Sequence, residues 1–164
     1  NPDTLLELEE CLILCNTGIL HNSGSIHTEQ KKSMTSKTIQ KIVKMNVELA
    51  YKTKNLLLRG ELDEFGRSLD QAWKFKRSFS NIISSKKLDS IYDGAISNGA
   101  IGGKLLGAGG GGFFIFYVPA FKKHKLIKFL EKKKLIIQPF KFELEGVKSW
   151  VSRDYNSLNP NKES

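Results

Sequence analysis

The feature that most constrains this chain is a glycine-rich segment that separates two short apolar stretches. It reads GGKLLGAGGGGF from Gly102 to Phe113, and five of the six residues 107–112 are glycine. Glycine adopts positive φ angles easily and lets a ligand or another part of the backbone come close. Consecutive amides in such a segment can converge on an anion. Because glycines raise the entropic cost of folding, we expect a function here; a ligand-free hairpin or a bulge is the alternative.

Two common glycine motifs do not fit this segment. A Walker phosphate loop ends in Gly-Lys-Ser/Thr and leads into a helix, whereas Lys104 precedes the glycines here. A dinucleotide-binding fingerprint also leads from a strand into a helix. The apolar residues 113–118 that follow these glycines predict a strand instead. The glycines therefore join one strand to another.

Hydrophobic periodicity and glycine and proline positions predict the elements around this segment. The continuous apolar residues 11–15 and the stop at Gly18 favour a strand, although a helix is also compatible with the start of this stretch. Gly60 is a typical helix terminator, and Pro119 a typical first residue. In chain order we predict a buried strand at 5–17, a polar loop at 21–25, a helix from about 25 to 58, helices at 62–73 and 88–95, strands at 101–107 and 113–118, a helix at 119–134, and one or two strands within 135–144.

This order, with strands joined by a tight turn and helices grouped together, is typical of an α+β fold. We expect an antiparallel sheet of ferredoxin-like character with helices on one face, plus additional helices. The chain has 164 residues, which fits one domain over 1–164 with a core at about 5–150 and a polar tail at 155–164. Trp73 and Trp150 are expected to be packing residues.

The formal net charge of the chain is +9, and much of it lies in the predicted last helix. A basic field attracts phosphorylated partners such as nucleotides, sugar phosphates or nucleic acid. A solvated lysine-rich helix face is the alternative. The longest apolar stretch, 113–118, is too short to span a bilayer, and the polar start does not resemble a secretory signal. We expect no membrane partner and a cytoplasmic location.

The two cysteines, Cys11 and Cys15, are expected to be buried and reduced. On a strand their Cα atoms would lie roughly 13 Å apart, and a disulfide needs less than about 7 Å. No histidine stands near them in the sequence to complete a zinc site. We therefore predict no metal ligands in this chain.

The segment Gly99–Phe113 resembles the third motif of the GHMP kinases. In its KLLGAGGGGF form it is most similar to the D-glycero-D-manno-heptose 7-phosphate kinases. Similar stretches occur in the same order at Leu5–Glu10, which leads to Thr17-Gly18, at Leu69–Arg77, and at Asp89–Ala95. The resemblance spans about residues 5–144. It departs from the family at His21, where these kinases often carry an arginine.

The resemblance implies a carboxy-terminal kinase domain that helps to transfer the γ-phosphate of ATP, with Mg²⁺, to a sugar hydroxyl. For the heptose kinases the acceptor is the anomeric hydroxyl of a heptose 7-phosphate. Galactose, fucose or phosphomevalonate are alternative acceptors within the family. The phosphate-loop segment of the family, its magnesium ligand and its catalytic acid-base residues belong to an amino-terminal domain, and no such segment occurs here. We therefore expect no catalytic residues in this chain, and no turnover by it alone.

The expected site residues follow from this resemblance. The loop near the nucleotide phosphates is expected to comprise Gly107, Ala108, Gly109, Gly110, Gly111 and Gly112, with Lys104 beside it. Lys76 and Arg77 are expected to bind the substrate, because arginine suits bidentate phosphate recognition; a favourable interaction with the helix dipole is the alternative. His21 and Ser23 could contact sugar hydroxyls.

A second class of function is a basic RNA-binding module. Such proteins stack bases on exposed aromatic side chains of a sheet, and Phe113, Phe114, Phe116 and Tyr117 could do so. The glycine segment has no role in that mode, so we do not expect a nucleic-acid partner. The expected partners are ATP, a sugar phosphate and an amino-terminal kinase domain, and an exposed strand edge could also support a homodimer.

Overall fold

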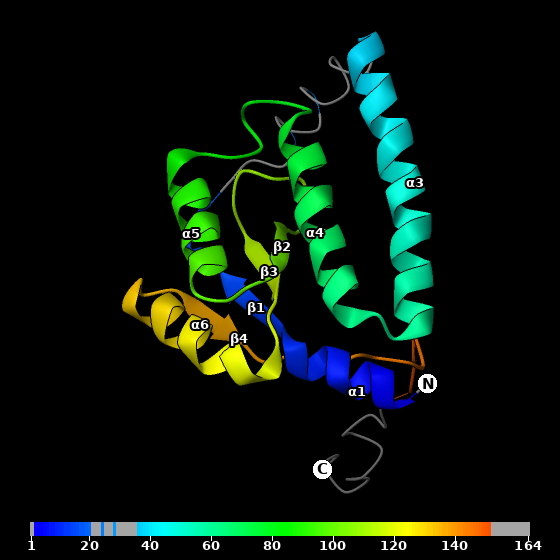
Figure 1. The fold of residues 1–164 in the computed structure, drawn as a ribbon, viewed down its shortest axis with the longest axis vertical. Helices are drawn as coiled ribbons and strands as arrows, with labels where there is room; N and C mark the ends of the chain where they lie inside the picture. Colours follow the sequence, from blue (N-terminus) through cyan, green and yellow to red (C-terminus); the bar gives the residue numbers. More distant parts are fainter. Residues whose placement is uncertain (1, 21–23, 25–27, 29–35, 152–164) are drawn as a thin grey trace, which may run out of the picture.

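The computed structural model describes residues 2–20, 24, 28 and 36–151. Four antiparallel strands form one sheet in the order β2-β3-β1-β4. Figure 1 shows α5 and α6 on one side of the sheet, and α4 between the sheet and α3. The elements are α1 (Pro2–Cys11), β1 (Leu12–Asn16), α3 (Lys37–Arg59), α4 (Leu62–Arg77), α5 (Lys86–Ser97), β2 (Gly102–Leu105), β3 (Phe113–Tyr117), α6 (Ala120–Lys132) and β4 (Ile136–Gln138).

The two faces of the sheet belong to two hydrophobic clusters. Alternate strand residues point to opposite faces, and one set, with Phe114 and Phe116 at its centre, packs with α4, α5 and α6. The other set, which includes Tyr117, packs with α1 and the start of α4. The larger cluster contains Ile13, Cys15, Trp73, Ile83, Leu88, Ile91, Tyr92, Ala95, Ala100, Leu105, Ala108, Phe114, Phe116, Val118, Leu126 and Leu130. The smaller contains Leu8, Cys11, Leu12, Leu62 and Tyr117. The expected α+β fold is confirmed.

Three of the four aromatic residues considered for base stacking are buried, and the fourth, Phe113, is half-buried. Phe114 and Phe116 have no exposed surface, and Tyr117 retains only 2%. Base stacking needs an aromatic face that is open to solvent. The arrangement therefore removes the main support for the RNA-binding alternative.

The predicted strand at 5–17 is wrong in its first half. Residues 2–11 form the helix α1, and only residues 12–16 form a strand. Pro2 at the first helical position and Asp3 in the first turn both favour a helix start. Leu8 and Cys11, three residues apart, form the buried side of this helix.

Near the carboxyl end, one of the one or two expected strands is present, and the expectation for Trp150 is wrong. Residues 135–144 contain the short strand β4 but no strand beyond Gln138. Phe142 donates its backbone N–H to Glu9 Oε2 of α1, at 3.0 Å, and not to a neighbouring strand. Trp150 is 83% exposed and is not a packing residue, whereas Trp73 is completely buried. The two cysteines are free and buried, as predicted.

Helix α3 ends where the sequence predicts. Gly60 has a φ of 72°, and its N–H bonds to Leu57 O while Glu61 N–H bonds to Leu56 O. This pair of bonds is a Schellman cap, which satisfies carbonyls that the helix end leaves open. Of the expected helix over 25–58, the part from Lys37 is confirmed, and most of the earlier residues lie outside the described ones.

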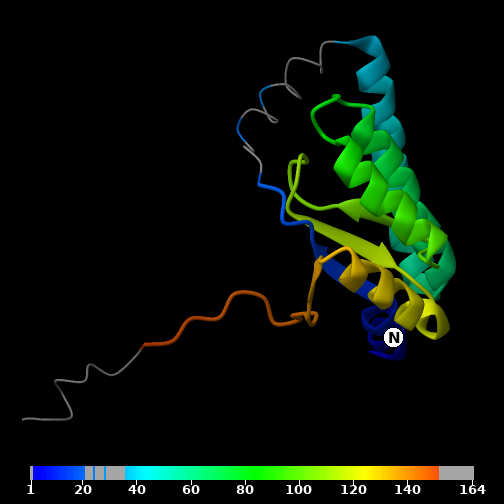
Figure 2. The same ribbon diagram turned by 90° about the vertical axis from the view of Figure 1, so that its left-hand side faces the viewer.

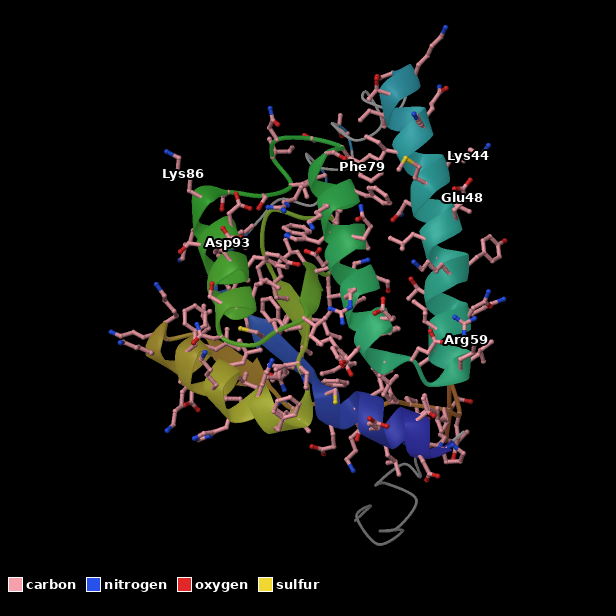
Figure 3. All side chains as sticks on the ribbon, viewed as in Figure 1. Lys44, Glu48, Arg59, Phe79, Lys86 and Asp93 are labelled. Carbon is pink, nitrogen blue, oxygen red and sulfur yellow. The ribbon has the colours of Figure 1, made fainter. Side chains whose placement is uncertain are left out.

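Charged side chains project from the outer sides of α3 and α5. Figure 3 shows Lys44 and Glu48 projecting from the side of α3 that faces away from α4, and Lys86 and Asp93 from the outer side of α5. In the part of the chain that the structure describes, no helix is both long and apolar enough to cross a lipid bilayer.

Helix α4 approaches β2 more closely than side chains would permit. A Cβ atom on Gly102 would lie 2.1 Å from the carbonyl oxygen of Gly66 in α4 and 3.0 Å from the amide nitrogen of Asp70. A Cβ atom on Gly66 would in turn lie 2.4 Å from the ring of Tyr117. Glycine is therefore required at position 102 for the contact between α4 and β2, and at position 66 for the contact between α4 and Tyr117 of β3.

Replacement of Gly102 by alanine is expected to destabilise the fold by about 3 kcal/mol, the upper end of the usual effect of overpacking. The added methyl group would meet rigid backbone, which cannot rotate away as a side chain can. Urea unfolding monitored by circular dichroism measures the change.

Gly146→Ala is the matched control. Gly146 has a φ of 70°, and among the described residues no atom lies within 4 Å of the point where its Cβ atom would stand. We expect this substitution to change the unfolding free energy by about 1 kcal/mol or less. Equal effects of the two substitutions would contradict the close contact between α4 and β2.

Candidate functional site

The glycine loop, residues 106–112, joins β2 to β3 at one end of the sheet. Figures 1 and 2 show it beside the connection between α4 and α5. Leu106 and Gly107 at its start are exposed, whereas Ala108, Gly109 and Gly111 are buried. The loop is held by three separate parts of the chain. These are residues 17–19 after β1, Ile83 between α4 and α5, and Lys76 near the end of α4.

The first anchor holds the carboxyl end of the loop. Thr17 donates both its backbone N–H and its hydroxyl to the carbonyl oxygen of Gly112, each over 2.8 Å. Gly112 N–H donates to Ile19 O at 3.2 Å. The Thr17 hydroxyl also accepts from Ile19 N–H, at 3.2 Å. Because Thr17 is only 2% exposed, water competes little for these bonds.

The second anchor holds the middle of the loop. Gly110 N–H donates to the carbonyl oxygen of Ile83 at 2.8 Å. The Ile83 side chain is fully buried, and a Cβ atom on Gly109 would lie 3.0 Å from its Cγ2. Gly109 has a φ of 124° and Gly110 a φ of 74°. Glycine is needed here both for these dihedral angles and for the contact with Ile83.

The third anchor holds the start of the loop. The Lys76 ammonium donates to the carbonyl oxygens of Leu105, at 2.9 Å, and of Gly107. Burial, followed by repulsion from Lys104, lowers the pKa of Lys76 from 10.5 to about 8. A protonated amine has three N–H donors, so these two bonds leave one for another acceptor.

The anchors divide the loop amides into two groups. The N–H groups of Gly110 and Gly112 are used inside the protein. Those of Gly107, Gly109 and Gly111 donate to no acceptor within the described part of the chain. The structure therefore combines a fixed backbone with three amides that lack an acceptor among the described residues, and the amide of Gly107 belongs to an exposed residue that an anion can approach.

Arg77 points away from the glycine loop and toward α5. Its guanidinium contacts Asp89 Oδ1 at 3.2 Å and lies 5.4 Å from the ring centre of Trp73 and 5.8 Å from that of Tyr92. Ser84 donates to the same Asp89 oxygen at 2.7 Å. These contacts tie the connection between α4 and α5, which carries Ile83, to both helices.

A second polar link joins α4 to α5. Tyr92 donates its hydroxyl to Asp70 Oδ1 at 2.7 Å, and Lys74 contacts the other carboxylate oxygen at 2.7 Å. Burial, together with the bond to Asp70, raises the pKa of Tyr92 above its ordinary value. Tyr92 therefore remains a neutral hydrogen-bond donor.

Lys104 lies on β2, two residues before the loop. Burial lowers its pKa. It is one wall of a groove of about 250 Å³ between α3 and α4, whose lining residues are Asn46, Leu49, Ala50, Thr53, Ser68, Leu69, Ala72 and Lys104. Lys104 and Lys76 thus lie near each other but face different surroundings.

Of the other expected site residues, His21 and Ser23 lie outside the described ones. Sequence reasoning did not assign a role to Thr17 or to Ile83. The Thr17-Gly18 pair carried a signal, since it belongs to the stretches that resemble the GHMP kinases. Ile83 carried none, because its role depends on its carbonyl oxygen and on a position that only the fold creates.

Comparison with known proteins identifies the family. The sequence profile described as GHMP kinases C terminal matches residues 53–134, half of the chain. The chain belongs to the GHMP kinase family. The matched region includes α4, α5, the glycine loop and α6, and therefore two of the three anchors of the loop.

Individual relatives agree with this assignment. The chain is 37% identical over 144 residues to a D-glycero-alpha-D-manno-heptose 7-phosphate kinase of Campylobacter jejuni, and the match covers 88% of this chain and 42% of that protein. It is 26% identical to a bifunctional fucokinase/GDP-fucose pyrophosphorylase of Arabidopsis thaliana, over 78% of this chain and 12% of that protein.

A solved structure supports the same fold. The crystal structure of a protein described as a sugar kinase from Campylobacter jejuni is 35% identical and superposes with a TM-score of 0.63. The match covers 92% of this GHMP kinase chain and 42% of that one. The chain thus spans less than half the length of the relatives that it matches.

Replacement of Thr17 by valine is expected to destabilise the chain by about 1–3 kcal/mol, because it removes a buried hydroxyl that serves as donor and acceptor. Valine keeps the size of the side chain, so the effect reports the hydrogen bonds. The unfolding free energy from urea titration measures it.

Thr53→Val is the control for this substitution. Among the described residues, the Thr53 hydroxyl bonds only to the carbonyl oxygen of Leu49, one turn earlier in α3. Loss of this hydroxyl should change the unfolding free energy by about 0.5 kcal/mol or less. An equally small effect at Thr17 would show that its hydroxyl does not anchor the loop.

Proposed function

We propose that this chain is the carboxy-terminal domain of an ATP-dependent sugar kinase that phosphorylates the anomeric hydroxyl of a heptose 7-phosphate. The observation that carries the proposal is the anchored glycine loop with its amides at Gly107, Gly109 and Gly111, which no acceptor in the described part of the chain uses. The acceptor is inferred from the 37% identity to a heptose 7-phosphate kinase. Fucose is the alternative acceptor with specific support, from the similarity to a fucokinase.

The loop suits phosphoryl transfer for an electrostatic reason. Catalysis of this reaction consists mainly of positioning and of stabilising negative charge on the transferring group. Backbone amides that are fixed before the substrate binds need no reorganisation as that charge develops. The three anchors supply this rigidity, and glycines let the phosphate approach the backbone closely.

ATP and Mg²⁺ are the expected cofactors of the complete enzyme. The amides of the glycine loop and the side chains of Lys76 and Lys104 fit the phosphate part of a nucleotide. The residues that the structure describes contain no group of three or more His, Cys, Asp or Glu side chains that could hold a metal ion. In our proposal another domain, which carries the phosphate loop, provides the magnesium ligands and the catalytic acid and base.

The acceptor is expected to bind at the same end of the sheet. Lys76 and Lys104 place two positive charges near this end, which attract the phosphate of the acceptor. His21 remains a candidate contact for the sugar. Arg77 is a weaker candidate than its sequence suggests, because Asp89 already binds its guanidinium. We propose that the complete enzyme acts in the cytoplasm, where ATP and sugar phosphates are available.

The direct test compares this chain with the complete kinase that contains it. With ATP, Mg²⁺ and heptose 7-phosphate, we expect the complete enzyme to form an anomeric phosphate and the chain alone to form none. ³¹P NMR of the products measures both. Turnover by the chain alone would contradict the need for a second domain. Failure of the complete enzyme with heptose 7-phosphate, fucose, galactose and phosphomevalonate would contradict the kinase proposal.

Gly110→Val is expected to lower the turnover of the complete enzyme by about a hundredfold or more, since small displacements of positioning groups have effects of this size. Valine disfavours the φ of 74° at this position, so the loop backbone must shift. The loss of stability should stay near about 1–2 kcal/mol.

The matched control is Gly146→Val, at a φ of 70° in an open stretch outside the loop. It should leave turnover unchanged. If Gly110→Val lowered the melting temperature sharply while turnover survived, the loop would be structural and not part of the site.

A further inference from the structure

We propose that Lys76 is a positioning residue, which holds the start of the glycine loop in its phosphate-binding conformation and adds a positive charge behind it. This inference rests on the proposed kinase function, but it replaces the expected role of Lys76 as a substrate ligand. Its basis is that the ammonium group binds two loop carbonyls, those of Leu105 and Gly107.

The start of the loop needs such a support. Gly107 is exposed and has a φ of 69°, and no atom of the described residues lies within 4 Å of the position where its side chain would stand. By contrast, Gly109 rests on Ile83, and Gly112 is bound by Thr17. Leu106 N–H donates to Phe113 O in the hairpin. Among the bonds that the described residues make, the two from Lys76 are the others that hold the start of the loop.

The same two bonds also restrict two peptide groups at the start of the loop. In a trans peptide the carbonyl and the N–H point in opposite directions. Lys76 draws inward the carbonyls of the two peptide groups that carry the N–H groups of Leu106 and Ala108, so it restricts the rotation of both. A change in either peptide would move Gly107, whose N–H donates to no acceptor among residues that the structure describes.

The charge of Lys76 is not neutralised by a neighbouring carboxylate among the described residues. On β2 its charged neighbour is Lys104, which repels it. On α4, Asp70 is bound by Lys74 and by Tyr92 of α5. The adjacent Arg77 is paired with Asp89 of α5. The positive charge behind the loop is therefore available to an anion on its other side.

This arrangement predicts a pH dependence. Because the pKa of Lys76 is about 8, the amine is mostly charged at pH 7 and mostly neutral at pH 9. The neutral amine can still donate two hydrogen bonds, so the loop stays in place while the charge is lost. The charged form is the active one, and turnover should fall as the pH rises through about 8.

The first experiment measures the loop directly in this chain. Hydrogen–deuterium exchange of the peptide covering residues 105–112 is compared for the unmodified chain, Lys76→Met and Lys74→Met. We expect at least tenfold faster exchange in Lys76→Met. Lys74→Met, which removes an exposed lysine two residues away on the same helix, should leave the rate unchanged. Circular dichroism shows whether each variant is folded.

Unchanged exchange in a folded Lys76→Met variant would overturn the inference, whether or not the protein is a kinase. If this variant does not fold, Lys76→Arg provides the test, because arginine keeps the charge and the donors. Loop exchange in Lys76→Arg close to that of the unmodified chain supports the inference, and tenfold faster exchange in folded Lys76→Arg opposes it.

The second experiment uses the complete kinase and separates charge from structure. Between pH 7 and 9.5 we expect kcat of the unmodified enzyme to fall about thirtyfold, as the charged fraction does for a pKa of about 8. Lys76→Arg should retain activity without this fall, since arginine stays protonated, and Lys76→Met should be slow at every pH. An unchanged alkaline fall in Lys76→Arg would overturn the inference. A second result would also overturn it. If KM for the sugar phosphate rises in Lys76→Met while kcat and loop exchange stay unchanged, Lys76 is a substrate ligand and not a positioning residue.

Discussion

The close contact between α4 and β2 determines the geometry of the site. Because no side chain separates Gly66 from Gly102, the helix backbone rests on the strand. From Gly66 to Lys76 the helix rises about 15 Å. From Gly102 to the carbonyls that Lys76 binds, the extended chain spans roughly 10 to 16 Å. The two lengths match, so a contact at one end of α4 places the ammonium group at the start of the glycine loop.

The glycine loop is a product of tertiary structure and not of the hairpin itself. Its anchors come from residues separated from it by up to 95 positions in the sequence, as for Thr17 and Gly112. A flexible loop of this composition loses much conformational entropy on ordering. The buried bonds at Thr17 and Ile83 offset that loss, because water cannot easily replace them. Rigidity of the loop therefore depends on the whole domain.

Much of the fold could be predicted from the sequence. The cap at Gly60, the helices α4, α5 and α6 and the strands on either side of the glycines follow from local periodicity and from glycine and proline positions. The boundary between α1 and β1 could not be predicted well, since the apolar run through Cys15 satisfies both a helix and a strand. The choice between them depends on packing against residues that are distant in the sequence.

The sequence predicts residues of the candidate site but not their arrangement. The glycines and Lys76 do lie together, whereas the sequence does not reveal that Gly110 and Gly112 use their amides internally. A long lysine side chain can reach several neighbours, so periodicity cannot show that Lys76 binds carbonyls. The exposure of Trp150 could not be predicted for a similar reason: a hydrophobic residue is buried only where the fold offers a surface to cover it.

The basic end of α4 illustrates how adjacent charges acquire different roles. Successive residues of a helix point about 100° apart, so Lys76 and Arg77 cannot both face the loop. Arg77 is neutralised by Asp89, and it stabilises the connection that carries Ile83. Lys76 and Lys104 form no ion pair within the described part of the chain. In the function that we propose, a phosphate at the loop would meet the charge of Lys76, while the arginine, the better phosphate ligand by chemistry, contributes through structure.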